Sequence, residues 1–173
     1  MAVSLYNLSV ESYLQTFAGL NACLEKGLAH CKEKDVDPEE IVATCLHPTM
    51  KTFNFQLQAM THHSIGALNA VKHGSYYPVQ DVPSLGYGEL QNMVVEAQQA
   101  LRGLAPADID GSEDEEVVFR FEEIAFPFTV ENFLLSFSLP NFYFHAATAY
   151  DILRMKGVPI GKIDYLGQMR IKS

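Results

Sequence analysis

Asn141, His145 and Thr148 are the residues of this sequence whose types and spacing best suit them to a binding or reaction site. They lie four and three positions apart within a largely apolar C-terminal block, residues 131–167, so on a helix the three side chains share one face. An amide and an imidazole four residues apart can reach the same ion or the same small ligand. A buried histidine satisfied by an amide or a backbone carbonyl would give the same pattern, and the residues alone leave both interpretations open.

The adjacent histidines His62 and His63 are the second candidates. Neighbouring residues on a helix point about 100° apart, so only one of the two rings can face the interior. His63 is the better inward choice because it follows Met60 by three residues, and Gln56 precedes it on the same side. The predicted ligand-binding pocket consists of Gln56, His63, Asn141 and His145.

Four long helices are expected to position these candidates, because apolar residues recur at three- and four-residue intervals. Capping residues such as Ser9 and Thr129 mark helix starts, and Gly74, Gly103 and Gly157 mark helix ends. The predicted long helices span residues 9–34, 48–73, 85–102 and 129–156, and a short helix that begins at Asp37-Pro38 spans residues 37–47.

The period of the apolar residues changes from helical to two between residues 117 and 128. Apolar residues alternate there with more polar or smaller ones on both sides of Glu122-Glu123. We predict a short β-hairpin that turns at these glutamates and directly precedes the last long helix.

Pro140 lies in the middle of that last predicted helix. It lacks the N–H group that would bond to the carbonyl of Ser136, and its ring crowds that carbonyl, so we expect a local kink one residue before Asn141. The segment after the helix, GVPIGKIDYLG, is expected to be a rigid extended strap packed on the helices. A catalytic loop is the alternative for this segment.

Composition restricts the class of protein. At 173 residues the chain fits one domain, residues 1–173, that can bury a core without disulfides or metals. The net charge is −9, which argues against nucleic acid as a partner because a phosphate-binding surface needs clustered basic residues. The apolar stretch 133–150 contains Asn141 and His145, so a buried helix is favoured over a membrane span, and no membrane partner is expected.

The cysteines and the N-terminus indicate the compartment. Cys23, Cys31 and Cys45 form no C-x-x-C pair and cannot all pair with one another, which favours free thiols in a reducing environment. No basic segment precedes an apolar core at the N-terminus, so we predict no signal peptide and a cytoplasmic location. With 48% hydrophobic residues, including 11 Phe and 8 Tyr, the chain carries more aromatic surface than one small domain readily hides, and we expect a homodimer.

Residues 140–167, PNFYFHAATAYDILRMKGVPIGKIDYLG, resemble the most characteristic stretch of an uncharacterised bacterial domain-of-unknown-function family in the DinB/YfiT-like superfamily. The N-terminal SLYNLSVESYLQ is similar to the opening of the same family. The resemblance implies an all-α fold, a DinB-like four-helix bundle with a short β-hairpin before the last long helix. Better-known members of the superfamily bind a divalent metal through one histidine on the second helix and an H-x-x-x-H pair on the fourth.

Carried over by this resemblance, the metal positions fall on Asn141 and His145 in the fourth helix and near Gln56 in the second. One of these three positions is a histidine, and Ser136 stands where many relatives have another. We therefore expect no cofactor and no tightly held transition metal, because such a site draws at least three nitrogen, sulfur or carboxylate ligands. If a divalent metal is bound, its ligands would be His145, His63 and Asn141.

Two functions follow from these expectations. The first is a protein that binds a small molecule in the polar pocket between helices and retains a degenerate metal site. The alternative, implied by the resemblance, is a divalent-metal-dependent transferase or hydrolase, with a bound water as the nucleophile. The sequence contains no phosphate loop, dinucleotide fingerprint, nucleophile elbow or H-E-x-x-H motif, so it favours no other enzyme class.

Overall fold

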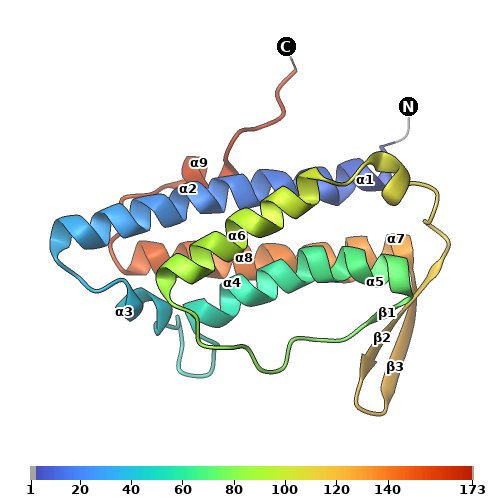
Figure 1. The fold of residues 1–173 in the computed structure, drawn as a ribbon, viewed down its shortest axis with the longest axis horizontal. Coiled ribbons are helices and arrows are strands. Elements are labelled where there is room, and N and C mark those ends of the chain that lie inside the picture. The colour runs from blue at the N-terminus through green and yellow to red at the C-terminus, as the bar shows by residue number, and fades with distance from the viewer. Residues whose placement is uncertain (1–2, 173) are drawn as a thin grey trace.

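The computed structural model describes residues 3–172, which fold into helices and one small sheet (Figure 1). Four long helical segments dominate: α2 (Val10–Lys34), α4 (Phe53–Thr61) continued by the π-helical turn η1 (His62–Gly66) and α5 (Ala67–His73), α6 (Tyr87–Arg102), and the π-helical turn η3 (Phe133–Ser138) continued by α8 (Leu139–Met155). The short elements are α1 (Leu5–Leu8), α3 (Glu39–Val42), the 3-10 turn η2 (Pro106–Asp108), α7 (Val130–Asn132) and α9 (Lys162–Leu166). The expectation of a mostly helical chain with a small β element is confirmed.

The long segments pack through their apolar faces. α2 contacts α6 and α8, and α4 contacts the same two helices from the other side, which places α4 beside α8 along much of its length (Figure 1). Most apolar positions that the helical period predicts as inward are buried, among them Phe17, Leu57 and Leu68, whereas Leu28 on α2 is 41% exposed. This shared interior is what brings Gln56 on α4 close to His145 on α8.

The second long helix begins later than predicted, at Phe53 instead of Pro48. The chain first makes a tight turn in which the backbone N–H of Met50 bonds to the carbonyl of His47 at 2.8 Å. The N–H of Phe53 then bonds back to the carbonyl of Thr44, also at 2.8 Å, so residues 47–52 form a loop between the helices. The preceding short helix correspondingly ends at Val42, before the predicted end at His47.

The sheet contains three strands in the order β1-β2-β3: β1 (Ser75–Tyr76), β2 (Glu116–Phe121) and β3 (Ile124–Thr129). β2 and β3 form an antiparallel hairpin around Glu122-Glu123, where Glu122 adopts a φ of 51°. β1 was not predicted, because two residues carry no readable period. It pairs in parallel with β2 and fixes Tyr76, which is 2% exposed, against the helices.

A π-helical turn, η3, ends at Ser138, two residues before Pro140, and α8 continues from Leu139; the kink expected at Pro140 stays a prediction. The segment after α8 differs from the extended strap that we expected, because Lys162–Leu166 forms the helix α9. Asp164 explains the helix: its Oδ2 accepts the N–H of Gly161 at 2.7 Å and caps the first turn. No helix among residues 3–172 has the length and apolar character needed to span a membrane.

Candidate functional site

Gln56 and His145 meet directly between α4 and α8. The side-chain oxygen Oε1 of Gln56 lies 2.7 Å from Nδ1 of His145. The Gln56 amide nitrogen Nε2 donates to the backbone carbonyl of Lys51 at 2.9 Å, and Gln56 is 2% exposed. The glutamine is therefore held at both ends of its amide.

This arrangement sets the tautomer of His145. Because Gln56 uses its N–H group for Lys51, only its oxygen faces the imidazole, and that oxygen can only accept a hydrogen bond. Nδ1 of His145 must then carry the proton, which leaves a lone pair on Nε2. His145 thus presents a hydrogen-bond acceptor on the side of the ring that faces away from Gln56.

His63 lies beside His145, as the helical spacing predicts for the inward member of the histidine pair. The two rings are nearly parallel, with centroids 5.5 Å apart and an interplanar angle of 17°. Nδ1 of His63 lies 3.0 Å from the Tyr76 hydroxyl, and His63 is 8% exposed. His62 turns the other way, with Nε2 at 2.7 Å from the carbonyl of Tyr77.

The backbone around His63 is fixed by a second set of buried contacts. His63 lies in η1, and its carbonyl accepts the hydroxyl proton of Ser138, the last residue of η3. The Tyr13 hydroxyl lies 2.6 Å from the same Ser138 oxygen. The two π-helical turns are thereby joined at the level of His63. Sequence reasoning missed Tyr13, Tyr76 and Ser138, for which the only signal was that Ser138 closely precedes Pro140.

Both imidazoles of the pair are neutral at physiological pH. Burial, followed by the proximity of His145 and then of His62, lowers the pKa of His63 to about 3. Burial lowers the pKa of His145 to about 4. Burial also raises the pKa of the Tyr76 phenol well above its ordinary value, so this group remains a neutral hydrogen-bonding partner.

Asn141 and Thr148 share the face of α8 with His145 but bond to their own helix. Nδ2 of Asn141 donates to the carbonyl of Phe137 at 2.8 Å, and the Thr148 hydroxyl donates to the carbonyl of Phe144 at 2.7 Å. The structure therefore brings Gln56, His63 and His145 together, while Asn141 has no hydrogen bond to the other three within residues 3–172.

The Nε2 atoms of His63 and His145 remain accessible. Neither atom has a hydrogen-bond partner among residues 3–172. Within that range, Oδ1 of Asn21 is the single side-chain atom that is both enclosed and without a partner, so neither Nε2 is enclosed. Aromatic rings surround the pair: Phe55 and Phe144 lie against His145, and Phe137 lies against His63. We define the His63 and His145 rings with these neighbours as the imidazole pair.

The donor set does not fit the metal that the superfamily resemblance implies. Residues 3–172 contain no cluster of three or more His, Cys, Asp or Glu side chains arranged to hold a metal ion. Of the matched positions, Gln56 and His145 are hydrogen-bonded to each other at 2.7 Å, and Asn141 is bonded to its own helix. A transition metal draws its ligands from imidazole, thiolate and carboxylate groups, and these positions supply one imidazole and two amides.

Comparison with known proteins places the chain in a family. The family model described as "Domain of unknown function (DUF1993)" matches residues 5–166. The chain is also similar to the crystal structure of a DinB family member protein from Shewanella denitrificans, with 26% sequence identity and a TM-score of 0.82 over 98% of this chain and 95% of that chain. A search of curated proteins found no match. The chain belongs to the DUF1993 family of domains of unknown function, within the DinB-like fold superfamily.

Proposed function

We propose that this protein is a DinB-like four-helix bundle, with a hairpin before its last long helix, that binds a small molecule at the imidazole pair and retains only a degenerate metal site. The observation that carries the proposal is the orientation of His145. Its Nδ1 is held by Gln56 at 2.7 Å, so its Nε2 lone pair is directed away from the protein partner. A neutral, oriented acceptor beside a second neutral imidazole is a binding site for a hydrogen-bond donor.

The surroundings specify the ligand further. The aromatic neighbours Phe55, Phe137 and Phe144 offer apolar contacts around the rings. No Asp or Glu lies between Glu40 and Asp81 or between Glu131 and Asp151, so α4 and α8 bring no carboxylate to the site. The ligand class is therefore an uncharged molecule with an N–H or O–H donor attached to an apolar or aromatic body.

Benzamide and N,N-dimethylbenzamide form a matched pair of probes, because only the first has an N–H donor. We expect benzamide to shift the ¹⁵N resonance of His145 Nε2 saturably, and the dimethyl compound to leave it in place. Read from the His63 resonances, the His145→Gln variant should lose the binding, while His73→Gln, at an exposed histidine of α5, should retain it. Equal effects of the two probes, or no shift of either ring, would refute the proposal.

The competing function is the divalent-metal-dependent transferase or hydrolase. One observation favours it: a histidine whose Nδ1–H is held by an oxygen acceptor presents Nε2 in the form that metals bind. Elemental analysis of protein purified without a histidine tag separates the two functions. We expect substoichiometric zinc, nickel and iron after dialysis against a mild chelator. Stoichiometric metal that is lost in His145→Ala would establish the metal-dependent alternative instead.

A further inference from the structure

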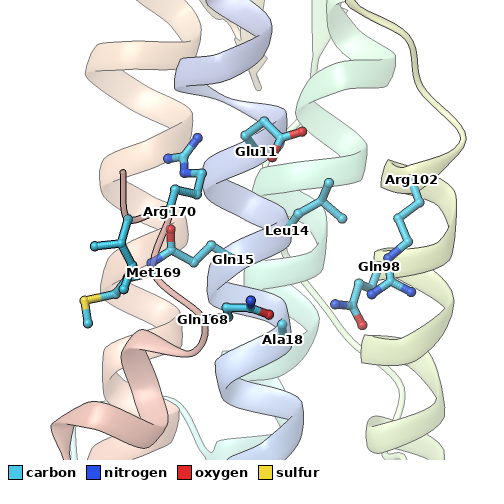
Figure 2. Close-up of a pocket in the computed structure, with 10 residues that line it drawn as sticks. Glu11, Leu14, Gln15, Ala18, Gln98, Arg102, Gln168, Met169 and Arg170 are labelled. Carbon is cyan, nitrogen blue, oxygen red and sulfur yellow. The ribbon is translucent and has the colours of Figure 1, made fainter. Parts of the chain in front are cut away.

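A groove of about 470 Å³ lies between α2, α6 and the C-terminal segment, away from the imidazole pair (Figure 2). Its α2 wall is made by Glu11, Leu14, Gln15 and Ala18. These residues are spaced by three, one and three positions, so they form one stripe along the helix. Neither His63 nor His145 lines this groove, which makes it a separate site.

The α6 wall carries Gln98 and Arg102, which are one helical turn apart and therefore neighbours on the helix surface. Figure 2 shows Gln98 pointing from α6 toward α2, with the Arg102 side chain alongside it. Gln98 is 9% exposed, its amide has no hydrogen-bond partner within residues 3–172, and neither amide atom is enclosed. The amide is therefore open to the groove, where a bound ligand can form hydrogen bonds that no protein group uses.

The third wall is the chain after α9. Nε2 of Gln15 donates to the carbonyl of Leu166 at 3.0 Å, and Gly167, with a φ of 60°, turns the chain along α2. Gln168, Met169 and Arg170 then line the groove. The tail thus adds an amide, an apolar side chain and a second guanidinium to the site.

The charge of the lining opposes that of the protein. Two of the four arginines in the sequence, Arg102 and Arg170, line the groove, against one acidic residue, Glu11. Neither arginine forms an ion pair with a carboxylate within residues 3–172; Arg170 makes one hydrogen bond, of 3.4 Å, to the carbonyl of Asn7. In a chain of net charge −9, the lining of this groove is therefore locally basic.

We propose that this groove binds a small amphipathic oxyanion, a carboxylate or a phosphate monoester with a short apolar chain. The planar guanidinium of Arg102 pairs with two oxygens of the anion, and the Gln98 amide donates to it. Leu14, Ala18 and Met169 contact the apolar chain. The volume matches a ligand of metabolite size, within the usual range of roughly 300–1,000 Å³ for small-molecule pockets.

Isothermal titration with sodium hexanoate, hexyl phosphate and 1-hexanol tests the proposal. We expect saturable binding of at least one anion and none of the neutral alcohol; which anion binds distinguishes a carboxylate ligand from a phosphate ester. Arg102→Gln should weaken that binding at least about tenfold, because it removes a bidentate charge-assisted contact. Arg102 is exposed, so the variant should fold, and its melting curve checks this.

Arg120→Gln is the matched control, since it removes the same charge from an exposed position on β2. It should bind the anion within about twofold of the unaltered protein, because a distant exposed charge is screened. Gln98→Leu should also weaken binding, through loss of the amide donor. Equal effects of the two arginine variants, equal binding of hexanol, or no saturable binding of either anion would overturn the proposal.

Discussion

Gln56 and His145 orient each other through the direction of their hydrogen bonds. The amide of Gln56 donates to Lys51 and accepts from His145, so neither side chain can turn over without leaving a polar atom unpaired. His63 shows the same principle with Tyr76 as its partner. Two neutral rings are thereby kept parallel, with one accessible nitrogen on each.

Replacing Gln56 by Glu should raise the depressed pKa of His145. A carboxylate in contact with Nδ1 stabilises the imidazolium, so the pKa of His145 should rise by about 1–3 units from its depressed value. Gln58→Glu is the control, because Gln58 bonds to Asn54 and to the carbonyl of Pro83, outside the imidazole pair. The measurement is an NMR pH titration; an unshifted His145 would contradict the assigned contact.

The depressed pKa values also predict how stability depends on pH. The folded pKa values of His63 and His145 lie near 3 and 4, so in the unfolded chain both rings bind protons at higher pH than in the folded protein. The free energy of unfolding is then highest above the ordinary histidine pKa and falls as the pH drops toward 4. Between pH 7 and pH 5 the loss should be about 2 kcal/mol for His63 and smaller for the partly accessible His145.

Urea unfolding at both pH values measures this loss. His145→Gln should reduce the pH dependence, because the substituted side chain no longer titrates. His73→Gln, at an exposed position, should leave the dependence unchanged. A free energy of unfolding that is the same at pH 7 and pH 5 in the unaltered protein would show that the rings are not held neutral by the fold.

At the level of elements, the two π-helical turns position the site. η1 carries His63 and η3 ends at Ser138, and the Ser138 hydroxyl bonds to the His63 carbonyl. A wide turn displaces carbonyls from the regular ladder, and such turns are frequent at functional sites. The imidazole pair therefore depends on the local geometry of both helices.

Pro140→Ala tests this dependence. Alanine restores the N–H that can bond to the carbonyl of Ser136 and favours regular α-helix through η3, which should move Ser138 relative to His63. We expect altered His63 and His145 resonances and titration with an unchanged far-UV circular dichroism spectrum. Pro48→Ala, at an exposed loop position before α4, should alter neither histidine. An unchanged His145 titration in Pro140→Ala would show that the geometry of the imidazole pair does not depend on Pro140.

The packing of α9 on α2 depends on Gly19. A Cβ added at Gly19 would lie 2.2 Å from the backbone oxygen of Tyr165, a rigid group that cannot rotate away. Gly19→Ala should therefore destabilise the protein by about 1–3 kcal/mol. In contrast, a Cβ at Gly88, within α6, meets nothing within 4 Å, and Gly88→Ala should stabilise the protein by up to about 1 kcal/mol. Thermal unfolding measures the stability of both variants. Equal changes in stability would rule out the close approach of the Tyr165 backbone to Gly19.

In the molecule as a whole most aromatic residues lie in the interior, but one side of α8 carries two exposed apolar side chains, with the exposed Asp151 between them. Phe144 is 55% exposed and Met155 is 53% exposed. They are eleven residues apart, about three turns, and so lie on the same side of α8. We propose this side of α8 as the surface of the homodimer that composition led us to expect.

Sedimentation should show a dimer at micromolar concentrations. Phe144→Glu should shift the equilibrium to monomer, because a buried unpaired carboxylate opposes association. Phe126→Glu makes the same change at a residue 53% exposed on β3 and should leave the dimer intact. A monomer at every micromolar concentration would exclude the dimer, and equal dissociation by both variants would exclude α8 as its surface.

Local patterns in the sequence specify which helix faces are buried and where most helices end. Helical spacing predicted His63 as the inward histidine, and Gly74 ends α5 in the left-handed conformation that glycine favours. These features depend on contacts within a few residues. The C-terminal block also carries the resemblance to the family, whose model matches residues 5–166.

Which polar groups meet, in contrast, depends on how the helices pack. Asn141 has the spacing of a pocket residue but bonds to its own helix, while Gln56 crosses to His145. Tyr76 reaches His63 from a two-residue strand, and Ser138 reaches it from a π-helical turn. Periodicity specifies the direction of a side chain, but its partner depends on the axial register and separation of packed helices. Those quantities are set by the whole interior, which no local pattern encodes.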